Sequence, residues 1–207
     1  MLDRELEESV LHHIMIVWGG KMVMDLDVWE FARKKGLEKI LEYQIECPMC
    51  GRKMTVEEYI YDMPNVGKVL LSGGKCEVCG YKHNDVRLAE PKTPRKIVFR
   101  VEKPGDENTL VIRASSASIV IPELGIEIKP GPAAKGYITT IEGIIIDVLE
   151  KTEFLCSSEG APKSECEKKI NELKAARDGA IPYTLIIVDP EGVSAIVSPR
   201  AKIEKLE

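Results

Sequence analysis

The most constraining feature of this sequence is a pair of matched cysteine motifs in its first half. Cys47-Pro48-Met49-Cys50-Gly51 and Cys76-Glu77-Val78-Cys79-Gly80 both have the form C-x-x-C-G, and 25 residues separate them. Two thiolates at this spacing can grip one metal ion from a tight turn, and the glycine after each pair lets the backbone turn beneath the metal. Four thiolates form a closed tetrahedral site, which is typical of structural zinc.

We therefore predict one structural Zn²⁺ ion held by Cys47, Cys50, Cys76 and Cys79, with an iron site as the alternative. The residues between the pairs are expected to form a hairpin that the metal closes. A segment of roughly 45 residues is too small to be stabilised by apolar burial alone, so removal of zinc is expected to unfold it. His83 follows the second pair, but the ligand set is already complete without it.

Charge argues against nucleic acid as the main partner. The 207 residues carry a formal net charge of -5, whereas a protein held mainly by phosphate contacts needs a basic excess. Residues 47–90 hold 6 basic and 6 acidic side chains, and a zinc ion with four thiolates makes this module slightly acidic. Basic residues in and around the hairpin nevertheless leave a nucleic-acid-binding zinc ribbon linked to translation as the alternative function; they are Lys68, Lys75, Lys82 and Arg87.

The sequence predicts a cytoplasmic protein with no membrane contact. Its longest apolar run, around 143–149, is much shorter than the roughly 20 residues that cross a bilayer. No charged n-region leads into a cleavable apolar segment. In a reducing compartment, cysteines indicate metal binding before disulfides.

The first 43 residues are predicted to form a helical segment of unknown role. Apolar residues recur on a four-residue step over 2–18, as in an amphipathic helix. A second helix is expected over about Asp25 to Tyr43, with Leu37, Ile40 and Leu41 in its apolar set. Met22 and Met24 are alternative translation starts.

Alternating apolar residues predict strands through most of the remaining chain. A polar, proline-containing bridge at 90–94 marks a domain boundary, so we expect a zinc finger over 44–90 and a β-rich domain over 91–207. Two capping-box patterns, at 139–142 and 164–167, predict a helical hairpin over about 140–178. Strands are expected at 59–61, 69–71, 96–101, 110–113, 119–121, 183–188 and 193–197.

These elements predict an α+β fold. It comprises N-terminal helices, a four-cysteine zinc-ribbon module, and a β-sandwich or barrel that carries the helical hairpin as an insertion.

No other group of residues predicts a catalytic centre. Cys156 and Cys166 have no histidine nearby, so we interpret them as buried or free thiols rather than as a second metal site. Glu123 and Glu142 could form an acid–base pair, but no nucleophile or phosphate-binding loop accompanies them. Residues 91–207 contain no histidine, which argues against a metalloenzyme on the β-rich domain. We predict that the protein is not an enzyme.

Over about residues 44–200 the chain resembles the ZPR-type zinc-finger family, in the archaeal form that has one zinc finger. Beyond the two cysteine motifs, the resemblance rests on the segments 79–86, 116–118, 121–124, 127–128, 135–143 and 182–187. It implies a zinc finger followed by a double-stranded β-helix domain with a helical hairpin. Where the family typically has Asp-Asp-Pro-Ser-Gly-Asn-Ser, this chain departs with Val188-Asp189-Pro190-Glu191-Gly192-Val193-Ser194.

The resemblance also implies a function through protein binding. Eukaryotic members bind translation elongation factor 1-alpha and help it to fold, so the expected partner is a homologue of that factor. Glu123, Lys135 and Glu142 lie in the shared segments and are our candidate partner-binding residues.

Overall fold

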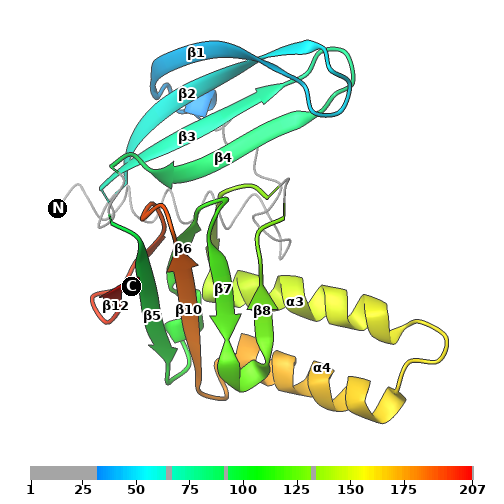
Figure 1. Ribbon diagram of the computed structural model, residues 1–207. Coiled ribbons are helices and arrows are strands. Elements are labelled where there is room, and N and C mark those ends of the chain that lie inside the picture. Colours follow the sequence, from blue (N-terminus) through cyan, green and yellow to red (C-terminus); the bar gives the residue numbers. More distant parts are fainter. Residues whose placement is uncertain (1–31, 64–66, 91–92, 132–133, 207) are drawn as a thin grey trace.

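The computed structural model describes residues 32–63, 67–90, 93–131 and 134–206, which form a zinc-finger sheet, a β-rich domain and a helical hairpin (Figure 1). The strands are β1 (Glu38–Glu46), β2 (Lys53–Met63), β3 (Gly67–Lys75), β4 (Lys82–Leu88), β5 (Arg95–Val101), β6 (Leu110–Arg113), β7 (Ser118–Ile121), β8 (Ile126–Ile128), β9 (Tyr137–Thr140), β10 (Tyr183–Asp189), β11 (Ala195–Ile196) and β12 (Lys202–Lys205). The helices are η2 (Asp106–Asn108), η3 (Pro122–Leu124), α3 (Ile141–Cys156) and α4 (Lys163–Arg177). In these described parts of the chain, no helix has the length and apolar character needed to cross a membrane.

The zinc-finger sheet consists of β1 to β4 in sequence order, with every neighbouring pair antiparallel. Because the strand direction alternates, the β1–β2 and β3–β4 turns lie at the same end of the sheet. Each of these two turns contains one cysteine pair. The topology therefore brings the two C-x-x-C-G motifs together across the intervening hairpin.

The β-rich domain pairs a five-stranded sheet, in the order β12-β5-β10-β7-β8, with a three-stranded sheet, in the order β11-β6-β9. Every second residue of β5 and β10 is buried, as expected for strands with one face against a core. Both sheets contribute to one hydrophobic cluster that includes Phe99, Ile112 and Leu185. The predicted sandwich is confirmed.

The zinc-finger sheet and the β-rich domain share that hydrophobic cluster. Tyr59, Leu71 and Val86 of the zinc-finger sheet belong to the same cluster as the core of the β-rich domain. The backbone N–H of Leu88 also donates to the carbonyl of Val193 at 2.9 Å. Much of the zinc-finger sheet is thus anchored by apolar burial in addition to metal.

Helices α3 and α4 form the predicted hairpin beside the β-rich domain. The tip of this hairpin projects away from the sheets of that domain (Figure 1). The N-cap of α3 is Thr140, one residue after the expected position, and its hydroxyl accepts the N–H of Gly143 at 3.1 Å. The predicted cap at Ser164 is wrong, because α4 begins at Lys163 after Pro162 with no side-chain cap.

The helix predicted over Asp25 to Tyr43 is wrong in its C-terminal part. Residues 32–34 are helical, but β1 begins at Glu38 and pairs with β2. The apolar spacing of Leu37, Ile40 and Leu41 is helical, yet pairing along β2 up to the first cysteine turn overrides this local preference. The helix predicted over 2–18 and the beginning of the second lie outside the described residues.

Candidate metal centre

The two cysteine turns have the same backbone structure. In each, the first cysteine accepts a backbone hydrogen bond from the glycine four residues later and donates one to the carbonyl of the residue after that glycine. The donor–acceptor distances are 2.8 and 2.7 Å at Cys47, and 2.9 and 2.8 Å at Cys76. Gly51 and Gly80 have φ angles of 70° and 75°, which only glycine adopts without strain. The glycine after each pair is therefore required by the turn.

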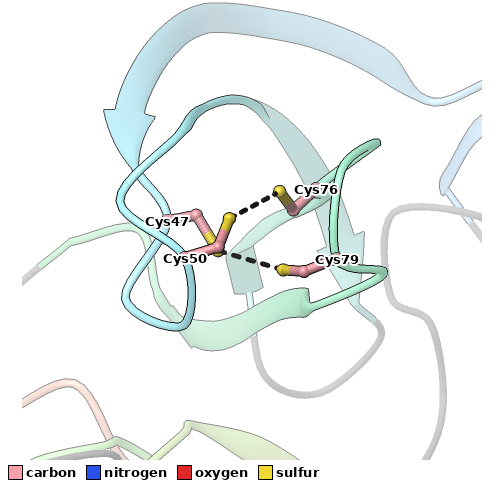
Figure 2. A group of neighbouring side chains, drawn as sticks. All are labelled: Cys47, Cys50, Cys76 and Cys79. Atoms are coloured by element: carbon pink, nitrogen blue, oxygen red, sulfur yellow. Dashed lines mark hydrogen bonds between the residues drawn. The ribbon is translucent and has the colours of Figure 1, made fainter.

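The four sulfur atoms form a compact cluster at the end of the sheet (Figure 2). The Sγ atoms of Cys47 and Cys79 lie 3.6 Å apart, those of Cys50 and Cys76 lie 3.7 Å apart, and all four lie within 4.8 Å of one another. A tetrahedron with zinc–sulfur bonds of about 2.3 Å has sulfur–sulfur edges of about 3.8 Å. The cluster thus fits a zinc ion bound by four thiolates, with no position left open for water or substrate.

The local electrostatics favour a cation at this position. Backbone N–H groups of Cys79 and Val78 donate to the Cys76 sulfur and lower the pKa of that thiol to about 7. The N–H of Tyr81 has the same effect on Cys79, but partial desolvation and the three neighbouring sulfurs outweigh it and raise the pKa of Cys79 to about 12. Four thiolates this close together would repel one another, so the thiols cannot all ionise without a counter-charge. A divalent cation supplies that charge.

The cluster has one packed side and one exposed side. Cys47 and Cys76 are buried with Met54 and Val56 in a small apolar cluster of their own. Cys50 is exposed, as is Cys79. The metal therefore organises the end of the sheet that the shared core does not reach.

Two exposed apolar residues lie inside the cysteine pairs, where sequence reasoning treated them only as spacers. Met49 is 71% exposed and Val78 is 67% exposed. They occupy the same position in the two matched turns, directly before the second cysteine. That equivalent position was the signal in the sequence that could have identified them.

The candidate partner-binding residue Glu123 lies in η3, and other residues of this chain bind its carboxylate. Its carboxylate accepts the N–H of Thr184 at 3.0 Å and the hydroxyl of the same residue at 2.8 Å, and it pairs with Arg100. The Glu123 side chain remains 36% exposed.

Lys135 and Glu142 lie on other elements. Lys135 precedes β9, and its Nζ donates to the carbonyl of Lys82 at 3.0 Å and lies 5.4 Å from the ring centroid of Tyr81. Glu142 is half-buried in the first turn of α3. Lys135 thus connects the β-rich domain to the strand that follows the second cysteine turn.

The prediction that Cys156 and Cys166 are thiols is wrong, because they form a disulfide with a Cα–Cα distance of 5.8 Å. Cys156 ends α3 and Cys166 lies in the first turn of α4, so the antiparallel helices bring them together across the loop. The sequence placed both at helix ends but did not show that the ends meet.

Known families match both halves of the chain. The ZPR1 zinc-finger domain matches residues 39–93, and the ZPR1 jelly-roll domain matches residues 105–206. The chain belongs to the ZPR1 family. ZPR1-like proteins of Methanocaldococcus jannaschii and Pyrococcus horikoshii are both 36% identical to it, over 79% and 82% of this chain and 84% and 79% of their own lengths. The zinc finger chaperone of Schizosaccharomyces pombe is 31% identical over 72% of this chain.

The ZPR1 zinc-finger match and the four-sulfur cluster together confirm the predicted cofactor, a structural zinc ion, in preference to iron. They also confirm the α+β class, because the zinc ribbon precedes a jelly roll with a helical hairpin. The chain spans about a third of the Schizosaccharomyces pombe relative, 34% of its length.

Proposed function

We propose that this protein is a cytoplasmic chaperone that binds incompletely folded translation elongation factor 1-alpha and assists its folding. Membership of the ZPR1 family supports this proposal, as does the printed name of the Schizosaccharomyces pombe relative, a zinc finger chaperone. In this proposal Cys47, Cys50, Cys76 and Cys79 are the zinc ligands, in a zinc finger over 44–90 that precedes the β-rich domain over 91–207.

The observation that carries the proposal is the exposed apolar pair Met49 and Val78 on the metal-bound turns. Neither side chain belongs to a buried cluster, and backbone hydrogen bonds close the turn around each of them. Exposed apolar side chains on an ordered backbone lose little conformational entropy when they bind. They are therefore suited to contact the apolar surface of an incompletely folded client. A purely structural zinc site would function equally well with polar residues at these two positions.

Glu123, Lys135 and Glu142 complete the proposed partner-binding set. Glu123 and Lys135 are exposed, and their internal hydrogen bonds fix their charged ends in place. Such fixed charges would orient a client that the apolar pair holds.

The test is a refolding assay with the native elongation factor 1-alpha. The denatured factor is diluted with or without the zinc-loaded protein, and the recovered GTP-binding activity is measured. We expect a higher yield with the zinc-loaded protein and no gain after chelation. The Met49→Ser, Val78→Ser double variant should lose most of the gain. Ile40→Ser is the matched control, because Ile40 is also an exposed apolar residue of this sheet, 46% accessible, but lies at the far end of β1 from the metal.

A pull-down separates binding from folding assistance. The factor should be retained by the wild type and by Ile40→Ser, and lost with chelator or with the double variant. Retention that is independent of zinc would count heavily against the proposal, and equal retention by the double variant would remove the apolar pair from it.

A further inference from the structure

The β-rich domain contains a cavity of about 640 Å³ at the β12 edge of its five-stranded sheet. Residues of β5, of β12 and of β11 with its flanking residues line it. Leu88, at the end of β4, completes the lining. This volume is in the range of small-molecule sites. Neither the zinc cluster nor the exposed turns contribute to the cavity.

The walls are aliphatic, with one cation among the lining residues that the structure describes. The larger aliphatic residues of the lining are Leu88, Ile97, Ile196, Val197 and Ile203. Two serines add hydroxyl groups, and the charged residue is Arg95. A ligand that fits this lining has an apolar body and one anionic group.

Arg95 is 4% exposed and is poorly satisfied. One terminal nitrogen donates to the carbonyl of Ser194, but the Nε–H group is buried without a hydrogen-bond partner. An unpaired buried donor on a charged group is costly, so an acceptor brought to this guanidinium would stabilise it.

The neighbouring carboxylate does not supply that acceptor. Asp189 lies opposite Arg95 in the β10–β5 register and is fully buried. Its two oxygens accept the N–H groups of Glu191 at 3.1 Å and Ser194 at 2.6 Å, so Asp189 holds the loop after β10. Among the described residues no ion pair within 4.0 Å involves Arg95, and burial lowers its pKa although the charge of Asp189 partly offsets this effect.

We propose that this cavity binds a carboxylate carried on an aliphatic group, with Arg95 as the anion-binding residue. A planar carboxylate matches the guanidinium edge, and the aliphatic walls take the hydrocarbon. A phosphate would need several further donors that this lining lacks. The ligand is either a free short-chain aliphatic acid or the C-terminal leucine, isoleucine or valine of a peptide.

Isothermal titration of the full zinc-loaded chain tests the proposal and separates the two sources. The probes are 4-methylpentanoate, its neutral amide, and a short peptide that ends in leucine with either a free or an amidated carboxyl group. A charge-assisted hydrogen bond is worth about 1.5–3 kcal/mol, so each acid should bind roughly 10- to 100-fold more tightly than its amide. Binding of the free acid assigns the small-molecule source, and binding of the peptide acid alone assigns the chain terminus.

Variants at the cavity mouth keep the test independent of folding. Ile203 is 63% exposed on the edge strand β12, so its substitution leaves the core intact. Ile203→Glu should weaken the binding of the acid at least 10-fold, whereas the matched Ile203→Lys should not weaken it. Arg95→Lys should reduce the preference for acid over amide. Equal binding of acids and amides, or no binding of either acid to the intact chain, would overturn the proposal.

Discussion

Gly136, directly before β9, lies close against β4 of the zinc-finger sheet, so a single methyl group there should push the zinc-finger sheet and the β-rich domain apart. A Cβ atom at this position would lie 2.3 Å from the carbonyl oxygen of Val86 and 2.5 Å from Oδ1 of Asp85. Ordinary contacts to a Cβ begin at 3.4 Å, so the start of β9 would have to move by about 1.1 Å (3.4 - 2.3). The Val86 oxygen is backbone and cannot swing away.

The expected cost follows from these contacts. The displacement breaks the hydrogen bond from the Gly136 N–H to the Asp85 carboxylate, which is 2.8 Å long. Loss of such a charge-assisted bond costs about 1.5–3 kcal/mol, and overpacking adds about 1–3 kcal/mol. Alanine restricts the unfolded chain and returns about 0.4–1 kcal/mol. We therefore expect Gly136→Ala to lower the free energy of unfolding by about 1.5–5.5 kcal/mol.

Urea unfolding of the zinc-loaded protein, followed by circular dichroism, measures this change. Gly131→Ala is the matched control, because a Cβ at Gly131 meets no atom within 4 Å. Hydrogen exchange should show faster exchange in β4 and β9 of Gly136→Ala, with less effect in β10. If Gly136→Ala unfolds at the same urea concentration as Gly131→Ala, the contact of Gly136 with β4 does not contribute to the stability of the protein, which refutes the reasoning.

Three further predictions concern the zinc, the disulfide and an ion pair. Cys76→Ser should yield a protein with one zinc fewer by metal analysis and with proteolytic cleavage confined to the cysteine turns; unchanged metal content would refute the ligand assignment. Cys156→Ser opens a loop whose ends are 10 residues apart, so unfolding should become easier by roughly 2.7 kcal/mol, and a reductant should then have no further effect on the variant. Arg200 lies 2.7 Å from the Asp106 carboxylate and lowers its pKa below 3.8, so this contribution to stability exists above that pH and is lost as the pH falls through the lowered value. Arg200→Gln should cost roughly 1 kcal/mol at neutral pH, since Arg200 is partly exposed, and the difference from the wild type should narrow in acid.

The zinc site was predictable because its information is local. A cysteine pair and the following glycine specify a turn, and two matched turns specify a tetrahedral sulfur site whatever strands lie between them. The strand at 96–101 was equally readable, because every second residue of β5 is buried and the sequence alternates in the same way. Local pattern and final structure agree at these positions.

The features that sequence reasoning missed depend on contacts between distant segments. β1 has almost no buried side chain, so its strand conformation comes from pairing with β2, which its own residues do not encode. The Cys156–Cys166 bond depends on how the two helices meet, and the cavity beside Arg95 depends on how two sheets of unequal width pack. Pairing and packing of this kind are decided by tertiary structure, which single-sequence patterns do not contain.

The six cysteines of this chain form two groups, a zinc-binding cluster and a disulfide, which the fold places in different parts of the molecule. Four converge as zinc ligands at the end of one sheet, while two are bonded across the tip of a helical hairpin on another part of the molecule (Figures 1 and 2). Thiol–disulfide exchange requires a thiolate that is free to attack, and a thiolate bound to zinc is not. Zinc loss should therefore expose the disulfide to attack by the released thiols. The zinc-loaded chain should keep the 156–166 bond in non-reducing peptide mapping, whereas chelated and partly unfolded protein should accumulate bonds that join either cysteine to the zinc-finger set.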